Sequence, residues 1–434
     1  MSASERFTPF LAPALGGRHV LDVLTERGFV QQTTDRAALR EALATPGLTF
    51  YVGFDPTAPS LHVGHLLPMM AMRWLSAAGH RPVVVHGGGT ARVGDPSGKD
   101  RTRDMLDDEG LARNLDGQRP QFDRFFGALT VIDAHAWSAL PDGGRGPEAT
   151  TLMVNNASWL MGWGYIDFLR EVGRHFSVNR MLSAESSRLR LERDQGLSFI
   201  EFNYHLLQSY DFLALWRKLG CTLQVGGDDQ WFNILGGVDL IRREGGPAVH
   251  ALTTPLLATS DGKKMGKTEK GAVFLDPAVV GPFDYFQFWI NCTDADVGRL
   301  LRIYTFLPID EIIALEALRG ADLREAKRVL AFQATALAHG EPAAREALSA
   351  AELVFAGGAA EAMPTATVDF PIAVVDALVA AGFAKSKGEA RRLIAGGGVR
   401  LGDDRVDDPE ARIDAPVVLW KGKKQAARLV NREA

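Results

Sequence analysis

The stretch Leu48-Thr-Phe-Tyr-Val-Gly-Phe-Asp-Pro-Thr-Ala-Pro-Ser-Leu-His-Val-Gly-His65 joins an apolar run to a turn rich in Gly, Pro, Asp and Ser. Residues 48–54 alternate in a way typical of a buried strand, and the apolar pattern of residues 66–75 predicts a helix. A strand, a turn and a helix in this order are typical of open α/β sheets that bind nucleotides, because the N–H groups of a helix N-terminus attract phosphate.

Two histidines, His62 and His65, lie at the predicted helix start, with Gly64 between them. Their imidazoles can donate hydrogen bonds to phosphate oxygens, and the glycine leaves room for a ligand. A short pair of this kind also occurs as an ordinary helix cap. The pair alone therefore leaves a phosphate site and a simple cap both open.

Composition describes a globular protein of more than one domain. The chain has 434 residues, of which 46% are hydrophobic and 23% charged. Its two cysteines, Cys221 and Cys292, lack the spacing of a disulfide framework or a zinc site. No apolar run reaches the ~18 residues that span a bilayer, and residues 1–17 make a poor targeting peptide. We therefore expect a cytoplasmic protein that does not enter membranes.

The order of predicted elements indicates the fold class. Predicted strands at 81–86, 129–132 and 250–257, and one that begins at Cys221 and leads into a glycine turn, alternate with helices such as 107–126, which predicts a doubly wound parallel (Rossmann-like) sheet. The glycine-rich loop 87–99 does not match a P-loop, and no G-x-G-x-x-G follows the first strand, so any ATP site uses another arrangement. We expect a catalytic domain at 1–280, an α-helical domain at 281–340, a linker with one short helix at 341–371 and a small α+β domain at 372–434.

Charge is distributed unevenly along the chain. Net charge is −5, yet residues 372–434 hold 12 Lys and Arg against 9 Asp and Glu. A basic C-terminal domain on an acidic body is a hint of a polyanion partner at that end. The side chains expected to meet RNA phosphates are Lys385, Lys387, Arg391, Arg392 and Arg400.

Three further segments carry candidate ligand-binding groups. The apolar helix predicted at 197–217 has a polar stripe, Tyr204, Gln208 and Asp211, which either bonds to neighbouring helices or forms a pocket wall for a small zwitterionic or phenolic ligand. Residues 226–230 form a glycine turn followed by acidic residues that suit ribose hydroxyls or a helix cap. Residues 260–268 crowd three lysines into a loop, which suits a polyphosphate but also occurs as a solvated basic loop.

Taken together, these motifs resemble those of the bacterial-type tyrosyl-tRNA synthetases, which are class I aminoacyl-tRNA synthetases. Residues 56–65 match the family's "HIGH" element with valine in place of isoleucine, and residues 264–268 match a loose form of its "KMSKS" element. The motifs occur in the family's order over nearly the whole chain. The C-terminal unit is similar to a small RNA-binding fold shared with a ribosomal protein.

The resemblance implies a two-step reaction. Tyrosine and ATP, with Mg²⁺ and no tightly bound cofactor, give tyrosyl-adenylate, and the tyrosyl group then passes to the 3′ end of tRNA(Tyr). It also implies a homodimer and no metal site. The residues assigned to stabilising the reacting phosphates are Thr57, His62, His65, Lys99, Arg103, Lys264, Lys267 and Thr268, with Arg101 an alternative to Arg103.

The resemblance also implies roles in substrate binding. It places Tyr51 and Asp211 on the phenol hydroxyl, Asp95, Tyr204 and Gln208 on the ammonium group, and Gln230 near the reacting carboxylate. The ATP-binding residues that it implies are Gly53, Asp55, His62, His65, Gly227, Asp229 and Lys267.

Two departures from the family pattern and three alternatives remain. Asp228 replaces a small hydroxyl residue, which predicts an extra carboxylate near the ribose, and an insert at 141–150 obscures the alignment around it. A tryptophanyl-tRNA synthetase or a small nucleotidylyltransferase shares this scaffold. A non-catalytic RNA-binding paralogue is the third alternative.

Overall fold

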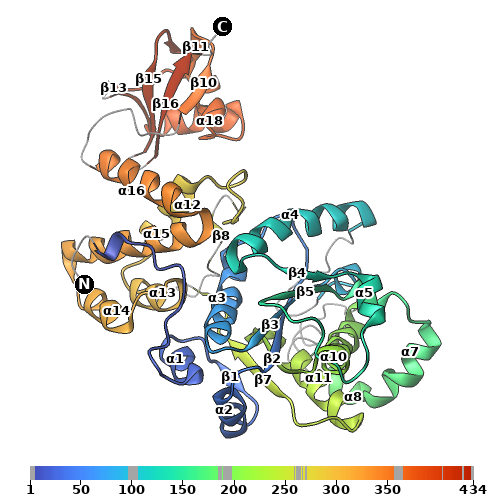
Figure 1. Ribbon diagram of the computed structural model, residues 1–434. Coiled ribbons are helices and arrows are strands. Elements are labelled where there is room, and N and C mark those ends of the chain that lie inside the picture. Colours follow the sequence, from blue (N-terminus) through green and yellow to red (C-terminus); the bar gives the residue numbers. More distant parts are fainter. Residues whose placement is uncertain are drawn as a thin grey trace. The chain divides into compact units, whose positions relative to one another are not determined.

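The computed structural model of the chain describes residues 5–95, 106–183, 188, 198–258, 260, 265, 267–268, 271–355, 365–402, 404–422 and 425–431 (Figure 1). The chain divides into two compact units, residues 1–281 with 288–339 and residues 282–287 with 340–434. Within the described ranges, no helix is both long and apolar enough to cross a membrane.

A seven-stranded sheet forms the centre of the first unit, with the order β1-β7-β6-β2-β3-β5-β4. Every neighbouring pair is parallel except β1 with β7. From β2 the chain moves first to β3 on one side of the sheet and later to β6 and β7 on the other, so β2 lies at the topological switch point where open α/β sheets bind ligands. The predicted doubly wound sheet is confirmed. The strands are β1 (Gln32–Thr33), β2 (Thr49–Phe54), β3 (Arg81–His86), β4 (Thr130–Ile132), β5 (Leu152–Asn155), β6 (Cys221–Gly227) and β7 (His250–Thr254).

Helices cover both faces of this sheet. Figure 1 shows α3 (Val63–Ala77) on one side of the strands and α10 (Phe199–Leu219) with α11 (Trp231–Arg243) on the other. This arrangement follows from right-handed crossovers that leave β2 in opposite directions. The remaining helices before residue 281 are α1 (Val20–Glu26), α2 (Arg36–Ala44), α4 (Asp108–Phe126), α5 (Ala134–Ala139), α6 (Ala157–Leu160), α7 (Tyr165–Glu171) and α8 (Val178–Leu182).

Two element boundaries differ from the sequence prediction. Helix α3 begins at Val63 rather than at residue 66, because the His62 side chain caps it. Strand β7 ends at Thr254 rather than at residue 257, because Pro255 has no N–H to donate to the sheet.

Helix α10 has well-defined ends and a close neighbour. Ser198 and Glu201 form a capping box at its start, and Gly220 ends it in the left-handed region at φ +61°. Helix α11 packs against it through Gly236, where a Cβ atom would lie 2.3 Å from Ser209 Oγ and 2.4 Å from His205 Cε1. The missing side chain therefore allows the two helices their close approach.

The predicted helical region is confirmed as α12 (Pro282–Ile290), α13 (Val297–Tyr304), α14 (Ile309–Glu316) and α15 (Leu323–His339). Buried Arg27 ties it to the N-terminal part of the same unit. Its guanidinium lies over the Trp74 ring at 4.3 Å and donates to the carbonyls of residues 302, 305 and 307 at 3.1, 3.0 and 2.5 Å. Residues 288–339 are thus part of the first compact unit.

The N-terminal segment also packs on this region. Arg6 pairs with Glu311 and Glu325, and the Phe7 ring meets Phe332 edge-on at 5.6 Å. The Gln333 amide donates to two carbonyls of the segment at 2.9 Å and accepts from Phe10 N–H at 2.9 Å.

The expected linker at 341–371 differs from the structure. The alanine-rich residues have high helix propensity and form the 15-residue helix α16 (Glu341–Phe355), and β10 (Thr365–Val368) joins the C-terminal sheet. That sheet has the order β10-β16-β15-β12-β13. Its other elements are β12 (Val399–Leu401), β13 (Asp404–Arg405), β15 (Val417–Lys421) and β16 (Gln425–Asn431), beside the β11 (Ile372–Ala373) and β14 (Arg412–Ile413) pair and helices α17 (Val374–Ala380) and α18 (Lys387–Ala395).

Candidate active site

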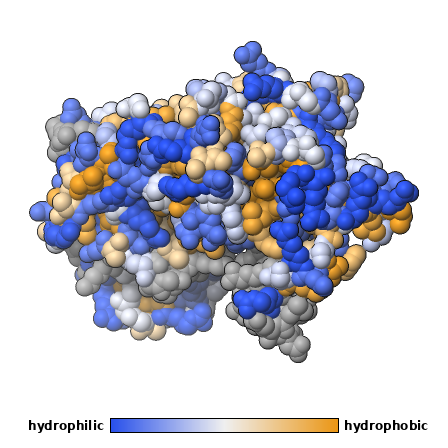
Figure 2. All heavy atoms as spheres, turned by 90° about the horizontal axis from the view of Figure 1, so that it is seen from below, coloured by the Kyte–Doolittle hydropathy of each residue, from blue (hydrophilic) through white to orange (hydrophobic). Residues whose placement is uncertain are grey.

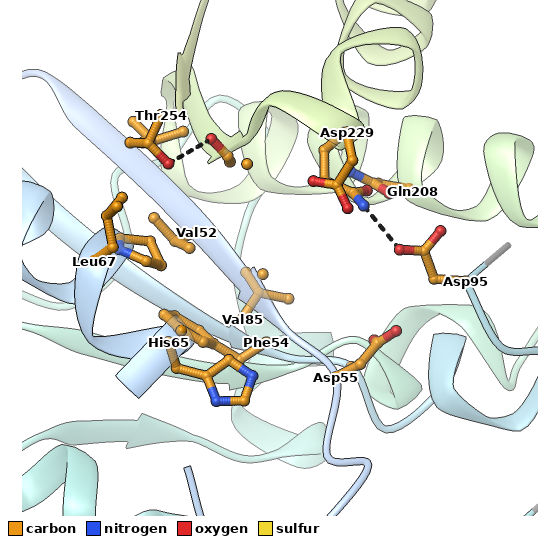
Figure 3. A pocket seen from close by; sticks show the side chains of 18 of the residues that line it. Val52, Phe54, Asp55, His65, Leu67, Val85, Asp95, Gln208, Asp229 and Thr254 are labelled. Carbon is orange, nitrogen blue, oxygen red and sulfur yellow. Dashed lines mark hydrogen bonds between the residues drawn. The ribbon is translucent and has the colours of Figure 1, made fainter. Parts of the chain in front are cut away.

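A cavity of about 420 Å³ opens at the carboxyl ends of the central strands, in the first unit. Figure 3 shows Asp95, Gln208 and Asp229 together on one side of it and Phe54 with His65 on another. The lining includes most of the residues that the sequence predicted: Gly53, Asp55, His62, His65, Asp95, Tyr204, Gln208, Asp211, Gly227, Asp229 and Gln230.

Seven predicted residues do not line the cavity in the described structure. Thr57 is exposed, and Tyr51 is buried behind the wall. Lys99, Arg103 and Lys264 lie outside the described residues, and only the backbone of Lys267 and Thr268 is described, in the short strand β8 (Lys267–Thr268) that pairs with β9 (Gly271–Ala272). Their predicted roles stay predictions.

The two histidines cap the helix and line the cavity at the same time. His62 Nδ1 accepts from Gly64 N–H at 3.0 Å, and His65 Nδ1 accepts from His62 N–H at 3.1 Å, which completes a capping box. The rings stack 3.9 Å apart. Because each Nδ1 is an acceptor, a neutral ring carries its proton on Nε2. The cap interpretation of the pair is confirmed, and the phosphate-binding role of the two histidines stays a prediction.

Asp55 holds two neighbouring hydroxyl groups. Its Oδ1 accepts from Thr90 Oγ1 at 2.8 Å and its Oδ2 accepts from the Tyr204 hydroxyl at 2.9 Å. Gly87 makes room for this carboxylate, since a Cβ there would lie 2.0 Å from Asp55 Oδ1. Because the Tyr204 proton points at Asp55, the lone pairs of the Tyr204 oxygen can accept a hydrogen bond from a ligand. Burial, followed by the nearby carboxylates Asp55 and Asp95, raises the pKa of Tyr204 well above its usual value.

Asp211 is a fully buried carboxylate in the wall of the cavity. It accepts from Trp159 Nε1 at 2.7 Å and from Asn156 Nδ2 at 3.0 Å. Burial nevertheless raises the pKa of Asp211 to about 7, because these two donors compensate only part of the lost hydration. The Tyr51 hydroxyl is buried without a partner among the described residues, and burial, then the charge of Asp211, raises the Tyr51 pKa.

The other end of the cavity carries amide and carboxylate groups. Gln230 Nε2 donates to Asp95 Oδ2 at 2.8 Å, along the dashed line that ends on Asp95 in Figure 3. The Oε1 atoms of Gln208 and Gln224 are buried without a partner in the part of the chain that the structure describes. Buried acceptors of this kind are costly unless a donor reaches them. They therefore favour a ligand with N–H groups, such as an ammonium ion.

Asp228 does not face the cavity, and the predicted extra carboxylate at the ribose is wrong. Its Oδ1 accepts from Gln32 Nε2 at 2.7 Å and from Thr253 Oγ1 at 2.9 Å, on the side of β1 and β7. The turn at Asp228–Gln230 is a single 3₁₀ turn, so successive side chains point in different directions. Asp229 and Gln230 line the cavity, and Asp228 supports the sheet instead.

Four side chains in or beside the cavity were not predicted from the sequence: Thr90, Asn156, Trp159 and Gln224. Thr90, Asn156 and Gln224 line the cavity, and Trp159 supports Asp211 from behind. Asn156 directly follows β5, so its place at a strand end was a usable signal, whereas Gln224 lies in the middle of β6 and carried none.

The basic residues of the C-terminal unit are partly engaged with acidic neighbours. Lys387 Nζ lies 2.6 Å from Asp376, Arg391 lies 3.2 Å from Glu410, and the Arg400 guanidinium lies 5.2 Å from the Trp420 ring centroid. These exposed pairs are weak and can exchange for phosphate contacts. Their role with RNA stays a prediction.

The described residues contain no group of three or more His, Cys, Asp and Glu side chains able to hold a metal ion.

Comparison with known proteins shows which proteins this chain is similar to. A tyrosine–tRNA ligase from Beijerinckia indica subsp. indica is 49% identical over 417 residues, which cover 93% of this chain and 95% of that protein. Another, from Rhizobium meliloti, is 47% identical over 418 residues, covering 93% of this chain and 96% of that protein. The crystal structure of a C-terminally truncated mitochondrial tyrosyl-tRNA synthetase from Aspergillus nidulans superposes with a TM-score of 0.65 at 29% identity, covering 80% of this chain and 97% of that chain.

Family comparison covers both parts of the chain. The family described as "tRNA synthetases class I (W and Y)" matches residues 44–356, and the S4 domain matches residues 374–415. The first match spans the switch-point cavity with its two capping histidines and also the helical region. This chain therefore belongs to the class I tRNA synthetases of the tryptophan and tyrosine family.

Proposed function

We propose that the chain is a tyrosine–tRNA ligase that activates L-tyrosine with ATP and transfers the tyrosyl group to the 3′ end of tRNA(Tyr). One observation supports the choice of amino acid: the carboxylate of Asp211 lines the cavity, and its charge acts on the buried hydroxyl of Tyr51, which has no partner among the described residues. The hydroxyl group of a phenol can donate a hydrogen bond to the Asp211 carboxylate, and its oxygen can accept one from the Tyr51 hydroxyl. An indole N–H can only donate, and a phenyl ring can do neither.

This pairing favours tyrosine over both competitors. Tryptophan would leave the Tyr51 hydroxyl without an acceptor, and phenylalanine would leave both groups unsatisfied. A site that hydrogen-bonds a substrate hydroxyl group rejects an analogue that lacks it, and tyrosyl-tRNA synthetases are the standard example of this discrimination.

The amino-acid end of the substrate fits the opposite wall. We assign the ammonium group to Asp95, the Tyr204 oxygen and Gln208 Oε1, because one is a carboxylate and the other two are acceptors with lone pairs facing the ligand. Gln230 Nε2 then lies where it can donate to the substrate carboxylate.

We assign ATP to the start of α3 and the turn after β6. The Nε2–H groups of His62 and His65 donate to phosphate oxygens, Gly53 and Gly227 allow close approach, and Asp55 and Asp229 face the nucleotide. The remaining phosphate-stabilising groups in this proposal are Thr57, Lys99, Arg103, Lys264, Lys267 and Thr268.

In the first step a carboxylate oxygen of tyrosine bonds to the α-phosphorus while the bond to pyrophosphate breaks. No enzyme nucleophile is needed, and the protein contributes positioning and donors for the negative charge on the leaving group. Mg²⁺ enters as part of the ATP substrate and takes few protein ligands.

Transfer to tRNA(Tyr) involves other parts of the chain. In this proposal residues 1–280 form the catalytic domain, residues 281–340 an anticodon-side helical domain, and residues 372–434 an RNA-binding domain in the cytoplasm.

We also propose a homodimer. Figure 2 shows patches of apolar surface among the hydrophilic ones on the face that it draws, and large exposed apolar side chains are frequent in and beside α6, α7, α8 and the start of α10. Exposed apolar side chains of this size mark interaction surfaces. They are Met161, Tyr165, Ile166, Val178, Leu182, Phe199 and Ile200.

The test of this function is exchange of pyrophosphate into ATP by the purified protein. Exchange that depends on L-tyrosine, and that L-tryptophan and L-phenylalanine do not support, is the expected result. Exchange with L-tryptophan alone would assign the other amino acid of the family, and no exchange with any amino acid would favour a non-catalytic RNA-binding protein.

A further inference from the structure

A line of side chains leads from the cavity into the space between α10 and α11. Gln230 Nε2 donates to Asp95 Oδ2 at 2.8 Å, and Asn233 Nδ2 donates to Gln230 Oε1 at 3.2 Å. His205 Nδ1 lies 3.2 Å from Asn233 Oδ1. Asn233 is buried and His205 lies outside the cavity lining, so neither reaches the substrate.

The direction of these hydrogen bonds follows from the chemistry of His205. Its ring lies between Phe176 and Phe232, with centroids 5.3 and 4.4 Å away, and burial lowers the pKa of His205 to about 4. The ring is therefore neutral near pH 7 and carries one N–H. Because Asn233 Oδ1 can only accept, that hydrogen lies on Nδ1.

All three hydrogen bonds therefore point the same way, with each residue donating to the next one toward the cavity. His205 donates to the oxygen of the Asn233 amide, so the nitrogen of that amide is the end that faces Gln230. Asn233 in turn donates to the oxygen of the Gln230 amide, so the nitrogen of Gln230 faces Asp95 and the cavity. A reversed Gln230 amide would place its oxygen against the Asp95 carboxylate.

We propose that His205 and Asn233 are positioning residues that fix the amide orientation of Gln230, so that its N–H groups face the carboxylate of the bound amino acid. This inference rests on the proposed function. A glutamine amide is broadly free about its last torsion, so an unsupported Gln230 would present its oxygen to the reacting carboxylate part of the time. Donors that are already oriented need no rearrangement when the reaction begins.

The fold provides the space that this line needs. His205 lies against Gly236, where a Cβ would be 2.4 Å from its Cε1 atom. The absent side chain lets the imidazole occupy the space between the helices.

Asn233→Asp tests the proposal, because aspartate keeps the size and still accepts from His205 but cannot donate to Gln230. Calorimetry measures the Kd of L-tyrosine and of L-tyrosinol, which keeps the ammonium group and lacks the carboxylate. We expect the Kd of L-tyrosine to rise about tenfold, or ~1.4 kcal/mol, and that of L-tyrosinol less than about threefold. Ser209→Ala, a buried change on the facing helix α10, is the control and should leave both values within about twofold.

Equal losses for L-tyrosine and L-tyrosinol would overturn the proposal, since they would indicate a general loosening of the pocket. An unchanged Kd for L-tyrosine would overturn it as well. If Asn233→Asp does not fold, the His205 pair decides: His205→Asn keeps a donor near Nδ1 and should bind L-tyrosine like the wild type, whereas His205→Leu should lose affinity selectively for L-tyrosine. Equal affinities in that pair would refute the role of His205.

The wild-type exchange assay separates this inference from the proposed function. Tyrosine-dependent exchange by the wild type together with unaffected variants would refute only the positioning role. Absence of exchange in the wild type would refute the function itself.

Discussion

Lowering the pH from 8 to 6 should weaken tyrosine binding through one buried group, Asp211. Burial raises the pKa of this carboxyl to about 7, although Asn156 and Trp159 donate to it. In the proposed complex the phenol O–H donates to the ionised carboxylate, which a proton on Asp211 would oppose. Protonation of Asp211 and binding of tyrosine therefore compete.

The size of the effect follows from the fraction of ionised protein. With a pKa of about 7, Asp211 is ionised in about one molecule in eleven at pH 6 and in about ten in eleven at pH 8. The apparent Kd varies inversely with the binding-competent fraction, so it should be about tenfold higher at pH 6 than at pH 8.

Isothermal titration calorimetry of L-tyrosine at both pH values measures this ratio. Titrations at pH 7 in two buffers of different ionisation enthalpy should also show proton release on binding. Asp211→Asn is the control, because any pH dependence that persists in it belongs to other groups. A wild-type Kd that is the same at pH 6 and pH 8 would refute the assigned role of Asp211 as a charged acceptor.

Three further outcomes are expected. The pKa of Asp211 is higher in the folded chain than its usual 3.8, so the stability that its bound proton contributes is present below about pH 4 and is lost as the pH rises through about 7. The whole loss is ~4 kcal/mol, of which ~3 kcal/mol falls between pH 5 and pH 8, and Asp211→Asn should remove this difference in urea unfolding at the two pH values. Arg27→Leu should lower the free energy of unfolding by ~3 kcal/mol at pH 7, because three buried carbonyls lose their donor, and an unchanged urea midpoint would contradict this. Asp228→Ser should leave the KM for ATP within about twofold and cost ~1 kcal/mol of stability through its contacts with Gln32 and Thr253, whereas a large change in KM would place Asp228 at the nucleotide after all.

Much of this fold could be predicted from the sequence, because the strand and helix patterns of the sequence match the elements that form in and around the sheet. The apolar run before Asp55 and the turn after it predict a strand end and a helix start, and both occur at the switch point. The stripe of Tyr204, Gln208 and Asp211 follows helical spacing, so one wall of the cavity was predictable once the helix was assigned.

The direction of individual side chains could not be predicted in the same way. Asp228 and Asp229 are neighbours of the same type, yet a single 3₁₀ turn directs one to the sheet and the other to the cavity. Asn156 and Trp159 carry no motif of their own, and only the fold brings them to Asp211. Only one short helix was expected within residues 341–371, and the length of α16 was underestimated because small residues that favour a helix also occur in linkers.

The N-terminal segment provides a probe of local unfolding far along the chain. The N–H of Phe10 donates to the side chain of Gln333, which is 323 residues later and belongs to α15. An amide held in this way exchanges its hydrogen with solvent only when the segment leaves the helix or when the helix itself opens. The rate of hydrogen exchange at Phe10 would thus report on opening of α15. The N-terminal segment, which contains no sequence motif, would in this way make local unfolding of the helical region measurable.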